Sequence, residues 1–283
     1  MLLRGLLEMA RPTMIIEALY SRRSSLLARP EWSAATNRTS GDENDLSDSA
    51  LACLLDGLAQ LSTFYSEQDM IISGQSPHSP EMVGTSDDSP WCAPLAQSLL
   101  DRSLGLLDDV RSQIAQWRAS NTVSEVSSLP CNYIPSTQPY PCTVVTRFST
   151  LAVANVVTFY NAVLILINQF VISMYKLVPL TALNNIGSSS ASNQISIAVV
   201  DILKSIDYHI AYTQTTALSA EGSSGPRNFY LLFPIRIAHR ALSQSKSPQD
   251  ITRSLWLEDV LSFIVNRAGP WASNKKIFGA RVV

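Results

Sequence analysis

The chain has few of the residues that build catalytic and metal sites. It holds three histidines and four cysteines among 283 residues, and Cys53, Cys92, Cys131 and Cys142 form no C-x-x-C pair. Neither a zinc site nor a disulfide framework is indicated. The sequence also lacks G-x-S-x-G, the P-loop, H-E-x-x-H, and a G-x-G-x-x-G between a strand and a helix. We therefore expect no catalytic residue, no metal and no cofactor.

Charged residues are scarce as well. They make up 16% of the chain and leave a formal net charge of −2, whereas typical soluble domains have about 25% charged residues. A nearly neutral chain gives no support to nucleic-acid binding by the chain as a whole. The first residues, MLLRGLLEMARP, are interrupted by Arg4, Glu8 and Arg11, so no apolar run is long enough for a signal peptide. A reducing compartment is consistent with this pattern.

One long stretch has no charge at all. No residue from Phe148 to Tyr175 is charged, and a helix of roughly 20 apolar residues can span a bilayer. Its amide and hydroxyl residues, however, fall within one arc of roughly 140° on a helical wheel. Facing lipid, such groups would cost several kcal/mol without hydrogen-bond partners. We therefore expect a buried helix inside a bundle and no membrane.

The spacing of apolar residues predicts helices along most of the chain. A period of 3.6 residues predicts six or seven helices and almost no strand. We expect an all-α fold, an irregular helical bundle with a buried uncharged central helix and long mobile loops. Residues 1–283 form a single helical domain in this prediction. Its parts are N-terminal helices over 1–66, a mobile loop over 67–93, an amphipathic helix over 94–118, a Pro-rich loop over 119–146 and a C-terminal helical core over 147–272.

Prolines and polar residues predict where helices begin and end. Pro12 is expected to break or restart a helix within residues 1–28, and Pro234 suits the first turn of a later one. The stretch NNIGSSSASN, residues 184–193, is expected to be a flexible joint. After it, a clean apolar stripe from Ile195 to Ile210 predicts the next helix.

Two helices have polar side chains that are candidates to face a ligand or partner. Arg236, His239 and Arg240 lie at i, i+3 and i+4 on one helix face, which could bind an anion. A solvated or ion-paired surface explains these three residues as well. Asp207 and His209, in contrast, are two residues apart and point in opposite directions on a helix, so they cannot share a metal site.

The uncharged helix has an amide row made of Asn155, Asn161 and Asn168. Such a row could line a small-molecule cavity between helices. Hydrogen bonds from helix to helix account for it equally well. The residues alone therefore lead to an all-helical domain and do not separate these two roles.

Several phrases, in their order, resemble the C-terminal regulatory region of fungal zinc-cluster transcription factors. They are ALYSRRSSLLARPEW, FYNAVLILINQF, SIDYHI, LLFPIRIAHRAL and WLEDVLSFIVNRAGPWA. In that family an uncharged helix with a Tyr near its middle comes first. Three later helices follow it, and their sequences resemble SIDYHI, LLFPIRIAHRAL and WLEDVLSFIVNRAGPWA. The resemblance covers most of the chain and is strongest over residues 151–271. It implies a nuclear protein of transcription regulation, a fungal transcription factor domain that in many members controls secondary metabolite biosynthesis.

The family's DNA-binding module holds two zinc ions with six cysteines in a basic segment, and this sequence does not contain it. The resemblance therefore implies a regulator without its own DNA-binding module, either a truncated product or a paralogue that has lost that end. We do not expect direct DNA binding; protein partners or a small-molecule effector are the expected ligands. A helical enzyme of fungal secondary metabolism and a single-span membrane protein are the alternatives to this non-enzymatic role.

Overall fold

The computed structural model describes residues 2–29, 44–74, 92–119, 123–126, 136, 138–178, 182–217 and 229–268. Within these residues the chain has seven α-helices, one short 3-10 helix and two strands. The prediction of an all-α fold is confirmed. The central residues of the predicted loops, 75–91 and 127–135, lie outside the described residues, so the expectation that they are mobile stays a prediction.

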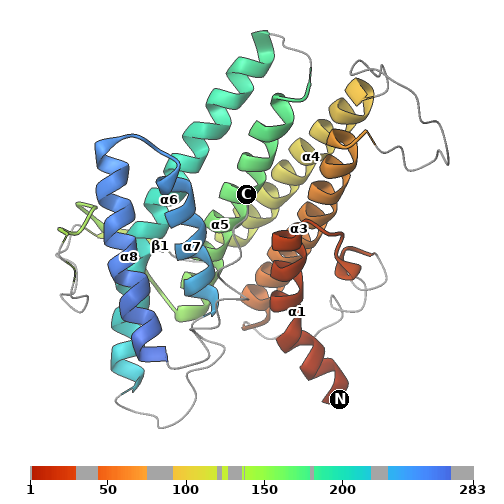
Figure 1. Cartoon of the computed structure of the whole chain (residues 1–283). Coiled ribbons are helices and arrows are strands. Elements are labelled where there is room, and N and C mark those ends of the chain that lie inside the picture. Colours follow the sequence, from red (N-terminus) through yellow and green to blue (C-terminus); the bar gives the residue numbers. More distant parts are fainter. Residues whose placement is uncertain are drawn as a thin grey trace.

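The helices are arranged around one central helix, α5 (Leu151–Tyr175), which lies between two groups of helices (Figure 1). On one side α3 (Asn44–Ile72) and α4 (Cys92–Ala119) pack on it, and α1 (Leu2–Ser21) packs on α3. On the other side lie α6 (Ala182–Ala217) and α7 (Phe229–Ser243), and α8 (Pro248–Ala268) packs on α7. The short helix η1 (Leu26–Ala28) follows α1.

Helix α5 is the core of the protein, as the uncharged stretch predicts. Thr150 caps its first turn by accepting a hydrogen bond from the Val153 amide. It is the one helix among the described residues that is long and apolar enough to cross a membrane. In its most apolar window 72% of the residues are buried inside the protein. In this fold, neighbouring helices therefore cover most of the α5 surface that would face lipid in a membrane-spanning helix.

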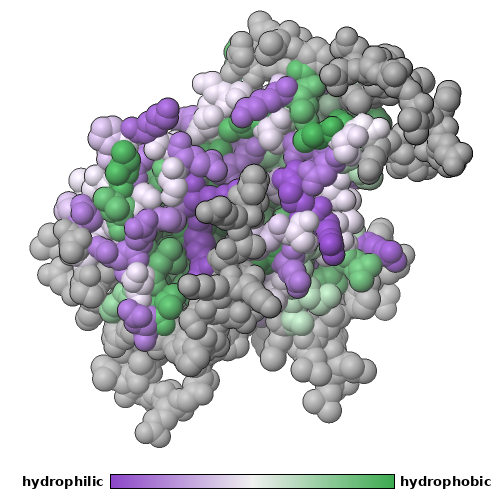
Figure 2. Space-filling model, in the orientation of Figure 1, coloured by the Kyte–Doolittle hydropathy of each residue, from purple (hydrophilic) through white to green (hydrophobic). Residues whose placement is uncertain are grey.

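The predicted apolar stripes are buried. Ala96, Leu100, Val110 and Ile114 of α4 are each at most 3% exposed. Helices α3 and α4 are longer than the sequence predicted, since α3 continues to Ile72 and α4 begins at Cys92. The surface in the same view mixes hydrophilic and apolar residues (Figure 2).

The predicted Pro-rich loop contains structure that periodicity did not indicate. Strand β1 (Val123–Val126) pairs antiparallel with β2 (Val145–Phe148), with Val123 opposite Phe148. A strand of four residues has too few alternating positions for its two-residue period to be recognised in a mostly helical sequence. Strand β2 also packs on α6, so the hairpin attaches this segment to the core.

Both prolines lie inside helices, contrary to the sequence-based expectation. Pro12 lies within α1 and Pro234 within α7. A proline removes one helical hydrogen bond and costs about 3 kcal/mol in a helix interior. Packing on both sides of Pro12 compensates: Arg11 pairs with Asp56 of α3, and Ile15 is fully buried.

The stretch 184–193 is helical rather than a flexible joint, because α6 begins at Ala182. Ser192 donates a hydrogen bond to the Ser188 carbonyl one turn earlier, and Ser196 donates to Ser192 in the same way. These bonds keep small polar side chains within the helix. Gly187 lies against the Tyr175 side chain at the end of α5, where a Cβ would meet the tyrosine hydroxyl.

Candidate functional site

The first polar feature inside the bundle surrounds His209 of α6, which is 2% exposed. Its Nε2 lies 3.0 Å from Thr158 Oγ1 on α5, and the Thr158 hydroxyl donates to Ser205 Oγ over 3.1 Å. Ser205 in turn donates to the Ile202 carbonyl. Because each hydroxyl has one proton and these directions use both, Nε2 of His209 is assigned as the donor to Thr158.

Burial determines the charge of this histidine. Removal from water lowers the pKa of His209 from 6.5 to about 4, and a hydrogen bond with the Ala154 backbone opposes that shift. The ring is therefore neutral at pH 7. It joins α6 to α5 through Thr158, which gives it a packing role.

Two neighbours of His209 in the phrase SIDYHI, Asp207 and Tyr208, connect α6 to strand β2. The Asp207 side chain is 4% exposed, and its Oδ2 lies 3.3 Å from Nη1 of Arg147 on β2. Tyr208 packs edge-on against Phe148 of the same strand, with ring centroids 5.2 Å apart. The phrase thus joins three elements of the core. In the described part of the chain, no three His, Cys, Asp or Glu side chains gather where a metal could bind.

The amide row of α5 bonds mainly to its own helix. Asn161 Nδ2 donates to the Val157 carbonyl over 3.1 Å, and Asn168 Nδ2 donates to the Leu164 carbonyl over 2.8 Å. Asn155 lies on the same helix and is half-buried. None of the three asparagines lines the cavity described below. The structure therefore gives these amides a place in the packing of α5.

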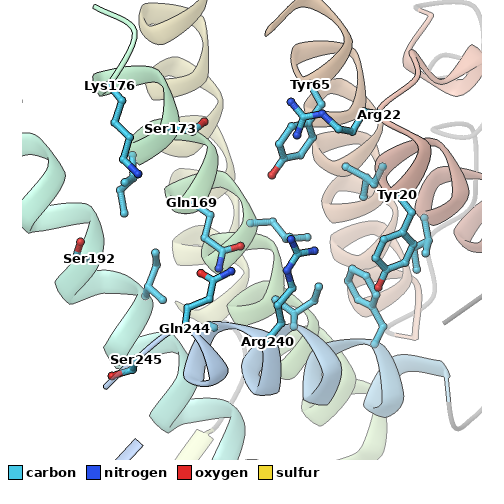
Figure 3. A pocket seen from close by; sticks show the side chains of 18 residues that line it. Tyr20, Arg22, Tyr65, Gln169, Ser173, Lys176, Ser192, Arg240, Gln244 and Ser245 are labelled. Carbon is cyan, nitrogen blue, oxygen red and sulfur yellow. The ribbon is translucent and has the colours of Figure 1, made fainter. Parts of the chain in front are cut away.

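The polar side chains of α7 contact helices on both sides of it. His239 Nε2 lies 3.1 Å from Glu258 Oε1, which joins α7 to α8. Arg236 is half-buried, and this burial lowers the pKa of its guanidinium while the nearby Tyr20 hydroxyl opposes the shift. Arg240 extends into a cavity (Figure 3). His239 thus contacts α8, whereas Arg236 and Arg240 both lie near Tyr20 of α1, and of these three residues only Arg240 lines the cavity.

The cavity is the second polar feature and has a volume of about 590 Å³. Residues of α1, α3, α5, α6 and α7 line it. Leu166, Phe233 and Ile237 contribute buried apolar surface. Figure 3 shows Lys176 and Gln169 on one wall, Tyr20 on the opposite wall, and Arg240 between them. Ligand pockets in proteins typically measure about 300–1,000 Å³, so the cavity has the size of a small-molecule site.

Arg22 builds one wall through an unusual backbone conformation. Its φ is 52°, a left-handed value that favours glycine, and its amide bonds to the Leu19 carbonyl. The guanidinium donates to Asp69 over 2.7 Å and to Gln68 over 2.8 Å. It also lies 4.6 Å from the centre of the Tyr65 ring. These contacts offset the backbone cost and hold the end of α1 against α3.

Gln68 extends this wall to α5. Its Nε2 donates to Ser173 Oγ over 2.7 Å, and Ser173 lines the cavity. Burial raises the pKa of the Tyr65 phenol, which the charges of Arg22 and Arg240 partly oppose. The pKa of Tyr20 is raised for the same reason, against Arg236 and Arg240. Both phenols are therefore neutral hydrogen-bond donors at pH 7.

Of the six predicted site residues, the cavity includes Arg240 alone. Sequence reasoning missed Tyr20 of α1, Tyr65 of α3, and Gln169 and Lys176 within and at the end of α5, which together form no motif. The pair Arg22-Arg23 is a short basic cluster in the sequence, but its first member proves to be a wall residue. No local signal distinguishes these residues from ordinary surface residues.

Comparison with protein-family models, curated proteins and solved structures finds no significant match to this chain. The family resemblance of the motifs therefore remains an expectation.

Proposed function

We propose that the chain is a regulator of transcription whose helical domain responds to a small-molecule effector, like the regulatory region of fungal zinc-cluster factors. The order of the motifs supports this proposal, and so does an all-α fold. The observation that carries it is the cavity of about 590 Å³, which five helices line. We place the protein in the nucleus, where it acts on protein partners rather than on DNA directly, and we expect its targets to include a secondary-metabolite gene cluster.

The position of the cavity suggests how an effector would act. Tyr20 and Arg22 come from the end of α1, whereas Phe233 and Arg240 come from α7. A ligand that contacts both sides would favour the arrangement in which these helices are close together. It would shift the population by the difference between its affinities for the two arrangements. The surface around α1 and α7 would then differ between the free and bound states.

Helix α7 is suited to transmit such a shift. Its Phe233 packs on Phe159 of α5, with ring centroids 5.4 Å apart, and its His239 pairs with Glu258 of α8. Displacement of Arg240 by a ligand would therefore move a helix that contacts both α5 and α8. No specific observation favours an enzyme, since neither His209 nor His239 lines the cavity.

Transcript measurement in the native host tests this function. Deletion of the gene is expected to change the transcripts of a defined set of genes, and the wild-type gene restores them. Ala241→Trp places an indole in the cavity, because Ala241 lines it, and should fix the regulator in one state. Ala115→Trp is the control, since Ala115 is exposed on α4 and outside the cavity. Unchanged transcripts after deletion would refute the proposal.

A further inference from the structure

The residues that line the cavity have charges of one sign. Arg22, Lys176 and Arg240 are among them, and no Asp or Glu is. Cations that surround a partly enclosed apolar space raise the local concentration of anions, because low-dielectric walls focus the field. The lining therefore favours an anionic ligand over a cationic one.

The three cations have different surroundings. Arg22 is held by Asp69 and lies over the Tyr65 ring, so it belongs to the wall. Lys176 follows the last turn of α5 and is exposed to solvent. Arg240 points from α7 into the space between the walls (Figure 3). Lys176 and Arg240 can thus approach an anionic group from two sides of the opening.

Neutral hydrogen-bond donors accompany these cations. Gln169 and Gln244 place carboxamides in the lining, and both are labelled beside Arg240 in Figure 3. The phenols of Tyr20 and Tyr65 stay protonated, so they add donors without adding negative charge. Carboxylate and phosphate oxygens accept several hydrogen bonds at once, and charged donors bind them more strongly than neutral ones do.

The rest of the lining is apolar. Leu166, Phe233 and Ile237 are each at most 9% exposed, and they face a space too large for a bare carboxylate or phosphate ion. Burying apolar surface contributes about 25 cal/mol per Å². A ligand that uses both parts of the lining must have an acidic group and an apolar body.

We propose that the cavity binds a small amphipathic organic anion. Its acidic group lies near Arg240 and Lys176, and its apolar body contacts Leu166, Phe233 and Ile237. A carboxylate and a phosphate share this chemistry. The inference rests on the proposed function for its biological meaning, because it names the ligand class of the same cavity. Binding by the purified chain is independent of transcription, so the two proposals can fail separately.

Displacement of a fluorescent probe tests the ligand class. The probe is 1-anilinonaphthalene-8-sulfonate, an apolar anion, added to the purified full chain. Decanoate and decyl phosphate are expected to displace it, whereas decanol and decyltrimethylammonium should need at least about tenfold higher concentrations, equivalent to about 1.4 kcal/mol. Displacement by decanoate alone or by decyl phosphate alone supports the proposal and identifies the acidic group. Equal displacement by decanol, or stronger displacement by the cation, would overturn it.

Variants locate the binding site. Arg240→Gln and Lys176→Gln should each weaken decanoate binding about tenfold and leave decanol binding unchanged. Arg23→Gln and Lys246→Gln are the matched controls, since both residues are exposed and lie outside the lining. Ala241→Trp should abolish displaceable probe binding. If the controls weaken decanoate binding as much as the cavity variants do, the proposal is wrong. If circular dichroism shows that Arg240→Gln does not fold, Lys176→Gln and the ligand series on the wild-type protein still test the proposal.

Discussion

The stability of the protein should depend on pH through His209. Burial lowers the pKa of this side chain from 6.5 to about 4 in the folded state. Between these two values the unfolded chain binds a proton that the folded protein does not, so acidification favours unfolding. The contribution of the neutral ring is complete above pH 6.5 and is lost as the pH falls to about 4.

The size of this effect follows from the two pKa values. Each pH unit between them changes the free energy of unfolding by about 1.4 kcal/mol. From pH 7.5 to pH 4.5 the loss attributable to His209 is about 2.5 kcal/mol. That is a large part of the 5–15 kcal/mol by which typical domains are stable. Carboxylates also titrate in this range, so the contribution of one histidine must be isolated by comparison.

The comparison is with His209→Gln, which cannot titrate but keeps an N–H donor for Thr158. Urea unfolding of both proteins, followed by circular dichroism, is measured at half-unit intervals from pH 7.5 to 4.5. The wild type should be the more stable at pH 7.5, and its advantage should shrink by about 2.5 kcal/mol at pH 4.5. Carboxylates common to both proteins cancel in the difference. An advantage that stays constant with pH would show that His209 is not buried as a neutral ring.

Three further stability measurements test other parts of the structure. Arg147→Met leaves the buried Asp207 carboxylate without this partner, so it should cost about 2–3 kcal/mol in urea unfolding, and Arg147→Lys should cost less. Gly187→Ala places a methyl group against the hydroxyl end of the Tyr175 side chain, so we expect it to give less than the stabilisation of about 1 kcal/mol that alanine brings to a helix interior; Tyr175→Ala should restore that gain, and an additive double mutant would contradict the contact. Arg22→Gly should be about 1 kcal/mol more stable than Arg22→Ala, because both lose the side-chain contacts and only glycine relieves the left-handed backbone; equal melting temperatures would contradict this.

Much of the fold could be predicted because burial follows periodicity. The apolar stripe from Ala96 to Trp117 is buried once another surface packs on it, and α3 and α5 provide that surface. The burial of α5 was predicted from the cost of its polar side chains in lipid, although Asn161 and Asn168 prove to donate to carbonyls of their own helix. In both cases the residue pattern of a single helix is enough to predict that it is buried.

The errors arose where contacts from other elements decide the local structure. Pro234 lies inside α7 because the residues on both sides of it, such as Leu232 and Ile235, are buried. The stretch 184–193 belongs to α6, which packs along α5, and no local propensity reveals that contact. Glycine and serine lower helix propensity by up to about 1 kcal/mol per residue, and a packed interface outweighs this cost.

The cavity was not predictable for the same reason, and its composition carries the functional argument. A helix face that is polar in the sequence can be solvated, ion-paired or ligand-facing, and on α7 His239 pairs with Glu258 whereas Arg236 and Arg240 lie near Tyr20. Arg240 differs from His239 because Tyr20 and Tyr65 of other helices lie across the cavity from it. A residue with a left-handed backbone, Arg22, builds part of the opposite wall at a cost that side-chain contacts offset. The site therefore depends on how α1 and α7 face each other, and that geometry is also what an effector in the cavity would change.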